Sequence, residues 1–178
     1  MKRIFVCAGM NLAKDDNINE QATKLGYLLA KRGVEYVQGG SAQGLMGLTL
    51  NAFLEKSKNV SFFIPKAYYD YDAPLLKELV GAKYFRAKKV LSEADRLKNI
   101  IQCDDIIVMP GGTGTLEELL YCNETVRAGE HVSRIFIVNI DGFFDGFLSQ
   151  LYRNLQEGMS KKSAFKFKVL TSIDQLRL

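Results

Sequence analysis

Residues 105–118 read DIIVMPGGTGTLEE, a short apolar run that leads through three glycines into a helical pattern. The run Asp105–Met109 lacks the polar alternation of a strand with one wet face, so it predicts a strand buried on both faces of a parallel sheet. The pattern that follows predicts a helix over Thr115–Ala128. A buried strand joined to a helix by glycines is typical of an α/β fold.

Predicted strands and helices also alternate on both sides of this segment. Asp16 and Asn17 are expected to cap the first helix, and Gly33 is expected to end it. Between residues 66 and 91 the pattern is weaker, and it predicts a short helix over 74–80 and a strand over 82–85. The other predicted strands are 2–7, 34–37, 60–64, 134–140 and 167–170, and the other predicted helices are 16–32, 45–57, 92–103 and 143–157.

Strands that alternate with helices and have no wet face favour a parallel sheet that is covered by helices on both sides. We therefore expect an α/β fold with a doubly wound parallel sheet, a Rossmann-like three-layer sandwich. No linker, repeat or low-complexity stretch interrupts the pattern. The chain is accordingly expected to form a single nucleotide-binding Rossmann-like domain over residues 1–178.

Composition narrows the class of protein. Hydrophobic residues make up 47% of the chain and charged residues 25%, which is ordinary globular usage, and the net charge is +4. A nucleic-acid-binding protein would show a denser basic stripe, whereas a small anionic ligand is enough to explain this mild excess. No apolar run approaches the length of a membrane span. Cys7, Cys103 and Cys122 form no C-x-x-C pair, so a cytoplasmic location is expected, with neither disulfides nor zinc.

Two glycine-rich turns stand between a predicted strand and a predicted helix, VQGGSAQGLMG at residues 37–47 and MPGGTGTLEE at residues 109–118. In open parallel sheets ligands bind beyond the carboxyl ends of the strands, and free amides at a helix start attract anions. Both turns therefore predict a phosphate site, although the glycines could simply permit tight turns. The candidate phosphate- and nucleotide-binding residues are Gly39, Gly40, Ser41, Gly44, Met46, Gly111, Gly112, Thr113, Gly114 and Thr115.

Several better-known sites are absent from the sequence. Neither turn carries the lysine of a Walker loop or the G-x-G-x-x-G dinucleotide fingerprint, so no ATP or NAD cofactor is expected. His131 is the one histidine and lies in a polar stretch, which leaves no Ser-His-Asp set. Asp104 and Asp105 would point in opposite directions on a strand, so they do not suggest a metal pair. Tyr68, Tyr69 and Tyr71 could line a base-binding pocket, but core or interface packing explains them equally.

Glu118 allows two interpretations. The spacing T-x-x-E from Thr115 to Glu118 is that of a capping box, in which Glu118 would bond back to the amide of Thr115. A carboxylate in the first helical turn beside a phosphate-sized cradle is equally well placed to face a ribose. The two roles are compatible in different ligand states.

The segment Pro110–Glu118 matches the PGGxGTxxE signature of the LOG (Lonely Guy) family, and Gly39–Gly47 resembles the GGGxxGLMG turn of the same family. The chain therefore resembles nucleoside 5′-monophosphate phosphoribohydrolases over residues 2–157. The resemblance implies hydrolysis of the N-glycosidic bond of an AMP-like nucleotide to a free base and ribose 5-phosphate, without metal or cofactor. It implies that Glu118 is the catalytic carboxylate, that both glycine turns hold the phosphate and ribose, and that the protein is a homodimer.

The chain departs from the family pattern at three places. The family's MHxRK motif falls on Ser92–Arg96 by ungapped counting, which puts Asp95 where the family has its arginine. Arg96 lies one residue later, a rotation of about 100° on a helix, and is the candidate partner of Glu118 if its long side chain reaches round; otherwise it faces solvent. The family's CGSS appears as Cys7–Met10, and its third turn glycine is Ser41. A non-catalytic protein on the same fold, binding a nucleotide or the molybdenum cofactor, is the alternative.

Overall fold

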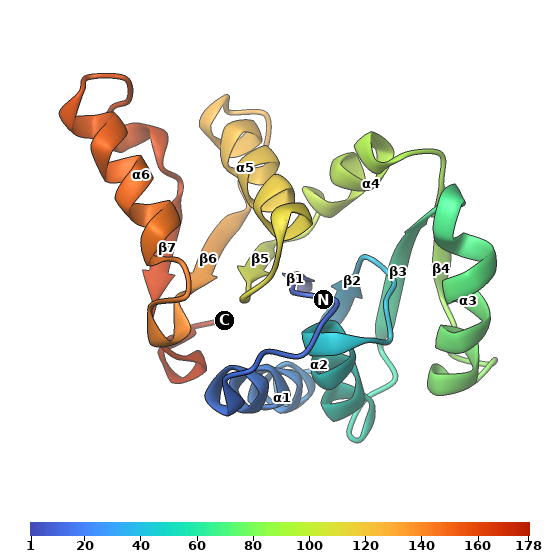
Figure 1. Cartoon of the computed structure of the whole chain (residues 1–178). Coiled ribbons are helices and arrows are strands. Elements are labelled where there is room, and N and C mark those ends of the chain that lie inside the picture. The colour runs from blue at the N-terminus through green and yellow to red at the C-terminus, as the bar shows by residue number, and fades with distance from the viewer.

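The computed structural model describes residues 1–178, which form one seven-stranded sheet in which every strand pairs in parallel with its neighbours (Figure 1). The order across the sheet is β4-β3-β2-β1-β5-β6-β7. The strands are β1 (Arg3–Cys7), β2 (Glu35–Gln38), β3 (Val60–Pro65), β4 (Ala87–Val90), β5 (Asp105–Val108), β6 (Arg134–Val138) and β7 (Phe167–Leu170). The helices are α1 (Asp16–Lys31), α2 (Gly44–Leu54), α3 (Lys66–Val80), α4 (Glu93–Ile100), α5 (Thr113–Arg127) and α6 (Asp145–Gln156).

Two separate cores, one on each face of the sheet, confirm the three-layer α/β architecture. Side chains of β1 alternate between them, because Ile4 and Val6 join a cluster with α1, α2 and α3 while Phe5 and Cys7 join a cluster with α4 and α5. Figure 1 shows α1 and α2 below the sheet and α4, α5 and α6 above it. The inner strands β1, β2, β3, β5 and β6 are buried along nearly their whole length, as their sequences predict. The edge strands β4 and β7 differ, because Lys88 and Lys89 of β4 and Lys168 and Val169 of β7 are exposed.

The doubly wound order places the switch of direction beside β1. From β1 the chain builds β2, β3 and β4 outward on one side, and then returns to place β5 on the other side of β1. The ends of β1 and β5 are in register, with Cys7 opposite Val108. The loops after these two strands therefore diverge from adjacent points, and ligands of doubly wound proteins bind in the crevice at this position.

The segment between residues 66 and 91 differs from the prediction. Helix α3 runs over Lys66–Val80 and includes Pro74 in its interior, whereas the sequence interpretation began a helix at that proline. The buried positions of α3 are Ala73, Leu76 and Val80, so one apolar stripe crosses the proline and holds the helix together despite its missing amide. The strand predicted over 82–85 is wrong. The chain turns there, and β4 follows at Ala87–Val90 instead.

The start of α5 also differs from the prediction. The helix begins at Thr113, two residues before the predicted start, and Gly112 is its N-cap. The other strands and helices agree with the prediction to within a few residues, and β7 pairs with β6 at the sheet edge. No helix combines the length and apolarity that crossing a bilayer requires.

Candidate active site

A cavity of about 400 Å³ opens at the switch point between β1 and β5. Its walls come from the loop after β1, the start of α2, the start of α5 and Phe143 before α6. Arg96 of α4 and Glu118 of α5 reach into it. The volume lies in the range of small-molecule sites and is sufficient for a nucleotide-sized ligand.

The start of α5 supplies the polar rim of this cavity, through Gly111, Gly112, Thr113, Gly114 and Thr115. The N-cap Gly112 contributes no side-chain cap, and the first amides of a helix have no partner earlier in the helix. These amides and the helix dipole favour an anion at the rim. The turn that the sequence interpretation assigned to a phosphate therefore lies at the rim of the cavity.

The capping-box interpretation of Thr115 and Glu118 is wrong. Because α5 begins at Thr113, Thr115 already lies inside the first turn, and its amide donates to the carbonyl of Gly112 at 3.1 Å. Glu118 then lies in the second turn, too far along the helix to cap it. Its side chain is left for the cavity.

The loop after β1 joins the two glycine turns. The amide of Gly9 donates to the carbonyl of Pro110 at 2.9 Å, and the carbonyl of Gly9 accepts from the amide of Met46 at 3.3 Å. Gly44, with φ of +57°, permits a close approach, since a Cβ there would lie 2.3 Å from the carbonyl carbon of Met10. The starts of α2 and α5 thus face one cavity across a shared loop.

Glu118 lies buried at the side of this cavity with one charged partner. Its Oε1 lies 3.0 Å from Nη2 of Arg96, and its side chain is only 9% exposed. Burial raises the pKa of Glu118 to about 7, although the charge of Arg96 and a hydrogen bond from the Cys7 thiol act in the opposite direction. A carboxyl group with such a pKa is present both protonated and ionised near neutral pH, which suits a general acid or base.

Arg96, and not Asp95, faces Glu118. Helix α4 starts at Glu93 with Ser92 as its N-cap, and Leu97 and Ile100 turn toward the core. This rotation directs Arg96 into the cavity, while the carboxylate of Asp95 lies 3.6 Å from Nζ of Lys98 on the helix surface. The ungapped count therefore assigns the family's arginine position to Asp95, whose side chain points toward Lys98. The guanidinium that faces Glu118 comes from Arg96 instead.

Four of the predicted phosphate-binding residues do not line the cavity, namely Gly39, Gly40, Ser41 and Gly44. They lie behind its wall, where Gly39 packs against the guanidinium of Arg96 and Gly40 against Ile64. From the first turn only Leu45 and Met46 reach the cavity. The buried amide of Gln38 holds this turn by donating to the carbonyl of Met46 at 3.0 Å.

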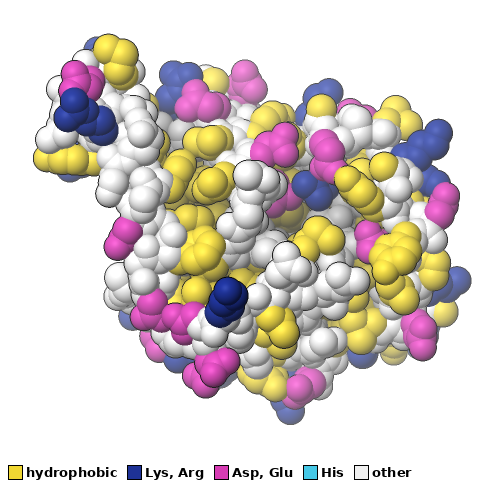
Figure 2. Space-filling model, in the orientation of Figure 1, with side chains coloured by type: hydrophobic (Ala, Val, Ile, Leu, Met, Phe, Trp, Pro, Cys, Tyr) yellow, Lys and Arg dark blue, Asp and Glu magenta, His cyan; other side chains and the backbone are white.

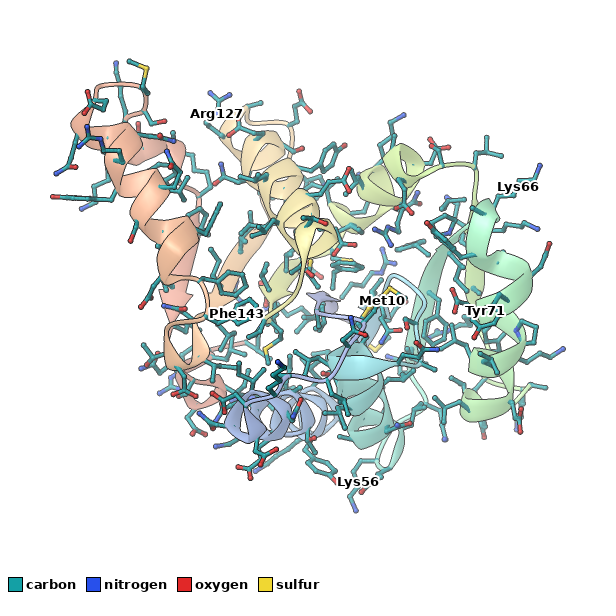
Figure 3. All side chains as sticks on the ribbon, in the orientation of Figure 1. Met10, Lys56, Lys66, Tyr71, Arg127 and Phe143 are labelled. Atoms are coloured by element: carbon teal, nitrogen blue, oxygen red, sulfur yellow. The ribbon has the colours of Figure 1, made fainter.

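The sequence interpretation missed the apolar wall of the cavity. Met10, Leu12 and Phe143 line it, and they are 57%, 61% and 48% exposed. Figure 3 places Phe143 and Met10 on opposite sides of the start of α5, and Figure 2 shows hydrophobic side chains gathered in the hollow between α5 and α6. These residues lie in the loops after β1 and β6, whose proximity depends on the strand order β1-β5-β6, so only that order could have indicated them.

The remaining candidates lie outside the cavity. Tyr68, Tyr69 and Tyr71 belong to α3, and Figure 3 shows Tyr71 at the far edge of the sheet. Nζ of Lys89 lies 4.7 Å from the centre of the Tyr69 ring. His131 lies near Gln102 in the loop before β6.

Comparison with known proteins supports the sequence resemblance. The family model described as "possible lysine decarboxylase" matches residues 46–176. The cytokinin riboside 5′-monophosphate phosphoribohydrolase LOG of Oryza sativa subsp. japonica is 32% identical over 164 residues, which cover 92% of this chain and 65% of the relative. The chain belongs to the LOG family. Its relative LOG7 of Arabidopsis thaliana, described with the same activity, is 32% identical over 88% of this chain and 70% of the relative.

A solved structure shares the fold of this LOG-family chain. The molybdenum cofactor carrier protein of Chlamydomonas reinhardtii superposes with a TM-score of 0.67, covering 97% of this chain and 91% of that chain. The two sequences are 15% identical. At this identity the likeness establishes the fold alone, so it gives no support to a carrier function.

Proposed function

We propose that this protein is a phosphoribohydrolase that cleaves the N-glycosidic bond of a nucleoside 5′-monophosphate. The observation that carries the proposal is the placement of Glu118 against Arg96, 3.0 Å apart, in a cavity rimmed by the start of α5. The LOG relatives are described as acting on cytokinin riboside 5′-monophosphates, which are nucleotides of this class. Our proposal is broader than that description, because it includes AMP-like nucleotides in general.

The phosphate of the nucleotide would bind the free amides at the start of α5. Gly111 has no room for a side chain, because a Cβ there would lie 2.1 Å from Oγ1 of Thr115. The glycine therefore lets Thr115 pack under the turn and keeps the amides of Thr113 and Gly114 directed at the rim. The mild positive net charge of the chain adds attraction for the anion.

Glu118 would act on the ribose. Breaking the bond between C1′ and the base nitrogen transfers the bonding electrons to the base and leaves an oxocarbenium-like sugar. An ionised Glu118 stabilises that positive charge and accepts a proton from the water that attacks C1′. The proton that Glu118 takes from the water balances the proton that the departing base gains, so the products are the free base and ribose 5-phosphate. Arg96 keeps Glu118 in place and part of its population ionised.

The apolar wall would receive the base. Phe143 lies beside the cavity on a turn that Asn139 holds, because the Asn139 side chain accepts from the amide of Phe144 at 2.7 Å and donates to Asp145 at 2.8 Å. An exposed aromatic ring on a fixed turn offers a flat surface for stacking a nucleobase. No lysine lines the cavity, whereas amino acid decarboxylation with pyridoxal phosphate requires one.

The experiment is incubation of the protein with AMP, CMP, GMP and a cytokinin riboside 5′-monophosphate, followed by chromatography of the free bases. We expect stoichiometric release of base and ribose 5-phosphate from at least one of them, and none from the matching nucleosides, which lack the phosphate. Tight binding of a nucleotide without base release would favour a carrier or sensor and would overturn the proposal.

We also propose that the protein is a homodimer, as the family resemblance implies. Large apolar side chains stand exposed near the helices of the site, including Leu91 at 83% and Leu120 at 44%. These side chains would be available to pack against a second subunit, and a contiguous apolar patch is what marks such an interface. Light scattering on a size-exclusion column is expected to give twice the chain mass of 20.0 kDa. A mass equal to one chain at micromolar concentration would exclude the dimer.

A further inference from the structure

Helix α4 presents two oppositely charged side chains on the face that turns toward the cavity. The hydroxyl of Ser92 accepts from the amide of Asp95 at 3.2 Å, which fixes the start of the helix at Glu93. Glu93 and Arg96 are then three residues apart and lie on the same helix face. Oε2 of Glu93 lies 2.9 Å from Nε of Arg96.

The guanidinium of Arg96 consequently lies between two carboxylates. Its Nε faces Glu93, and its Nη2 faces Glu118 at 3.0 Å. Its Nη1 faces Gly39, where a Cβ would stand only 3.1 Å away. The three nitrogens of the side chain thus face α4 itself, α5 and the turn after β2.

The contact with Glu93 is an ion pair without an aligned hydrogen bond. The two atoms lie 2.9 Å apart, yet both Nε of Arg96 and Oε2 of Glu93 are buried with no hydrogen-bond partner, because the N–H does not point at the oxygen. The attraction is therefore electrostatic, and it is strengthened by the burial of both atoms. The Glu93 side chain as a whole remains 41% exposed.

This pair accounts for the shifted arginine. The family pattern has its arginine at the position of Asp95, whereas here Arg96 supplies the guanidinium that meets Glu118. A long arginine side chain has several rotamers available, and an anion three residues earlier on the same helix face favours one of them. Asp95 cannot do this, because its carboxylate lies toward Lys98.

We infer that Glu93 is a positioning residue that holds the Arg96 guanidinium against Glu118. This inference rests on the proposed phosphoribohydrolase function. Glu93 does not contact the reacting atoms. It acts through Arg96, whose alignment sets how Glu118 meets the developing charge on the ribose, and small misplacements of such groups lower turnover more than binding.

The test compares Glu93→Gln with Asp95→Asn, a matched control that removes a carboxylate of similar exposure, 35% against 41%, from the same helix turn. For Glu93→Gln we expect kcat to fall about tenfold with KM for the nucleotide within about twofold, because the phosphate and base contacts are untouched. For Asp95→Asn we expect both values to stay within about twofold of the wild type.

A double-mutant cycle separates positioning from a general effect on the helix. In an Arg96→Ala background, Glu93→Gln is expected to cause no further loss of kcat, because the residue it positions is gone. An undiminished tenfold loss in that background would overturn the inference, as would wild-type kcat in Glu93→Gln alone. If the wild-type protein releases no base from any nucleotide, the proposed function fails first, and that result is distinct from an active wild type with an equally active Glu93→Gln.

Discussion

Two buried carboxylates lie toward opposite ends of β5, and their surroundings differ. Asp105 is at the amino end of the strand, and Glu118 lies past its carboxyl end. Asp105 begins the strand, and its fully buried side chain accepts two hydrogen bonds from Arg134, at 2.6 and 2.7 Å. It also forms an ion pair with Lys2, at 2.8 Å. Glu118 follows the strand by one glycine turn and has one charged partner, Arg96. It faces a cavity, and Asp105 does not.

This contrast separates a carboxylate that supports the fold from one that is available for chemistry. The charge of Asp105 is neutralised on both sides, and it ties the start of β5 to β6 and to the N-terminal segment. Burial raises the pKa of Glu118 to about 7, so ionising this carboxyl group in the folded protein is unfavourable. Such an expensive, under-partnered group in a cavity is the usual mark of a functional site.

The largest expected effect comes from Glu118→Gln, which removes the charge and keeps the shape. We expect kcat for base release to fall at least about a hundredfold, because the carboxylate stabilises the ribosyl cation and orients water. Nucleotide binding and the circular dichroism spectrum should be unchanged. A variant with wild-type turnover would show that Glu118 is another Asp105, a structural residue only.

The second effect is expected from Asp105→Asn, which replaces the other carboxylate by its amide at the start of β5. Its partners Lys2 and Arg134 are 33% and 49% exposed and can turn to water, so we expect a loss of about 2 kcal/mol in unfolding free energy, below the usual cost of breaking a fully buried pair. The kcat of the folded variant should match the wild type. Urea denaturation measures the unfolding free energy, and kinetics on the same samples measure kcat. A large fall in kcat in a fully folded variant would contradict the assignment of Asp105 as a structural carboxylate.

The third effect is on how stability depends on pH. Because the folded pKa of Glu118 is raised from 4.5 to about 7, its protonated form contributes stability fully below pH 4.5, and that contribution is lost as pH rises through 7. Wild type should therefore lose stability relative to Glu118→Gln over this range, by at most about 1.4 kcal/mol per pH unit. Urea titrations at pH 5, 6, 7 and 8 measure the difference; parallel curves would show that the carboxyl titrates normally.

The smallest effect is expected from Phe143→Ala, which removes the flat apolar wall and leaves both carboxylates in place. We expect KM for the nucleotide to rise about fivefold, a typical contribution of one aromatic contact, while inhibition by ribose 5-phosphate changes less than about twofold. Tyr152, an aromatic side chain of α6 that is 62% exposed and outside the cavity, provides the control Tyr152→Ala. Equal weakening of both ligands would place the base elsewhere.

Local patterns predicted those parts of the molecule that depend on local physics. The run Asp105–Val108, the glycines after it and the helix after them are specified by neighbouring residues, so the strand and its turn agree with the prediction. In α3 the local rule misled, because Pro74 suggests a helix start while the stripe Ala73, Leu76 and Val80 continues through it. Burial of that stripe outweighs the local cost of the proline.

The site was predictable only in part for the same reason. Gly111–Thr115 and Glu118 were found because they share one motif, and Arg96 because it is one residue from a motif position. Whether Arg96 or Asp95 faces Glu118 depends on where α4 begins, which Ser92 fixes. Phe143 and Met10 meet only through the order of strands, and Glu93 matters only because Arg96 turns inward. No spacing along the chain encodes those contacts.

The most direct test of the proposed role of Glu118 is a crystal structure of the Glu118→Gln protein with AMP bound. We expect the phosphate on the amides that begin α5, the base against Phe143, and one water that is hydrogen-bonded to the side chain at position 118 and faces C1′ of the ribose. A nucleotide bound away from the cavity between β1 and β5, or a ribose far from position 118, would contradict it.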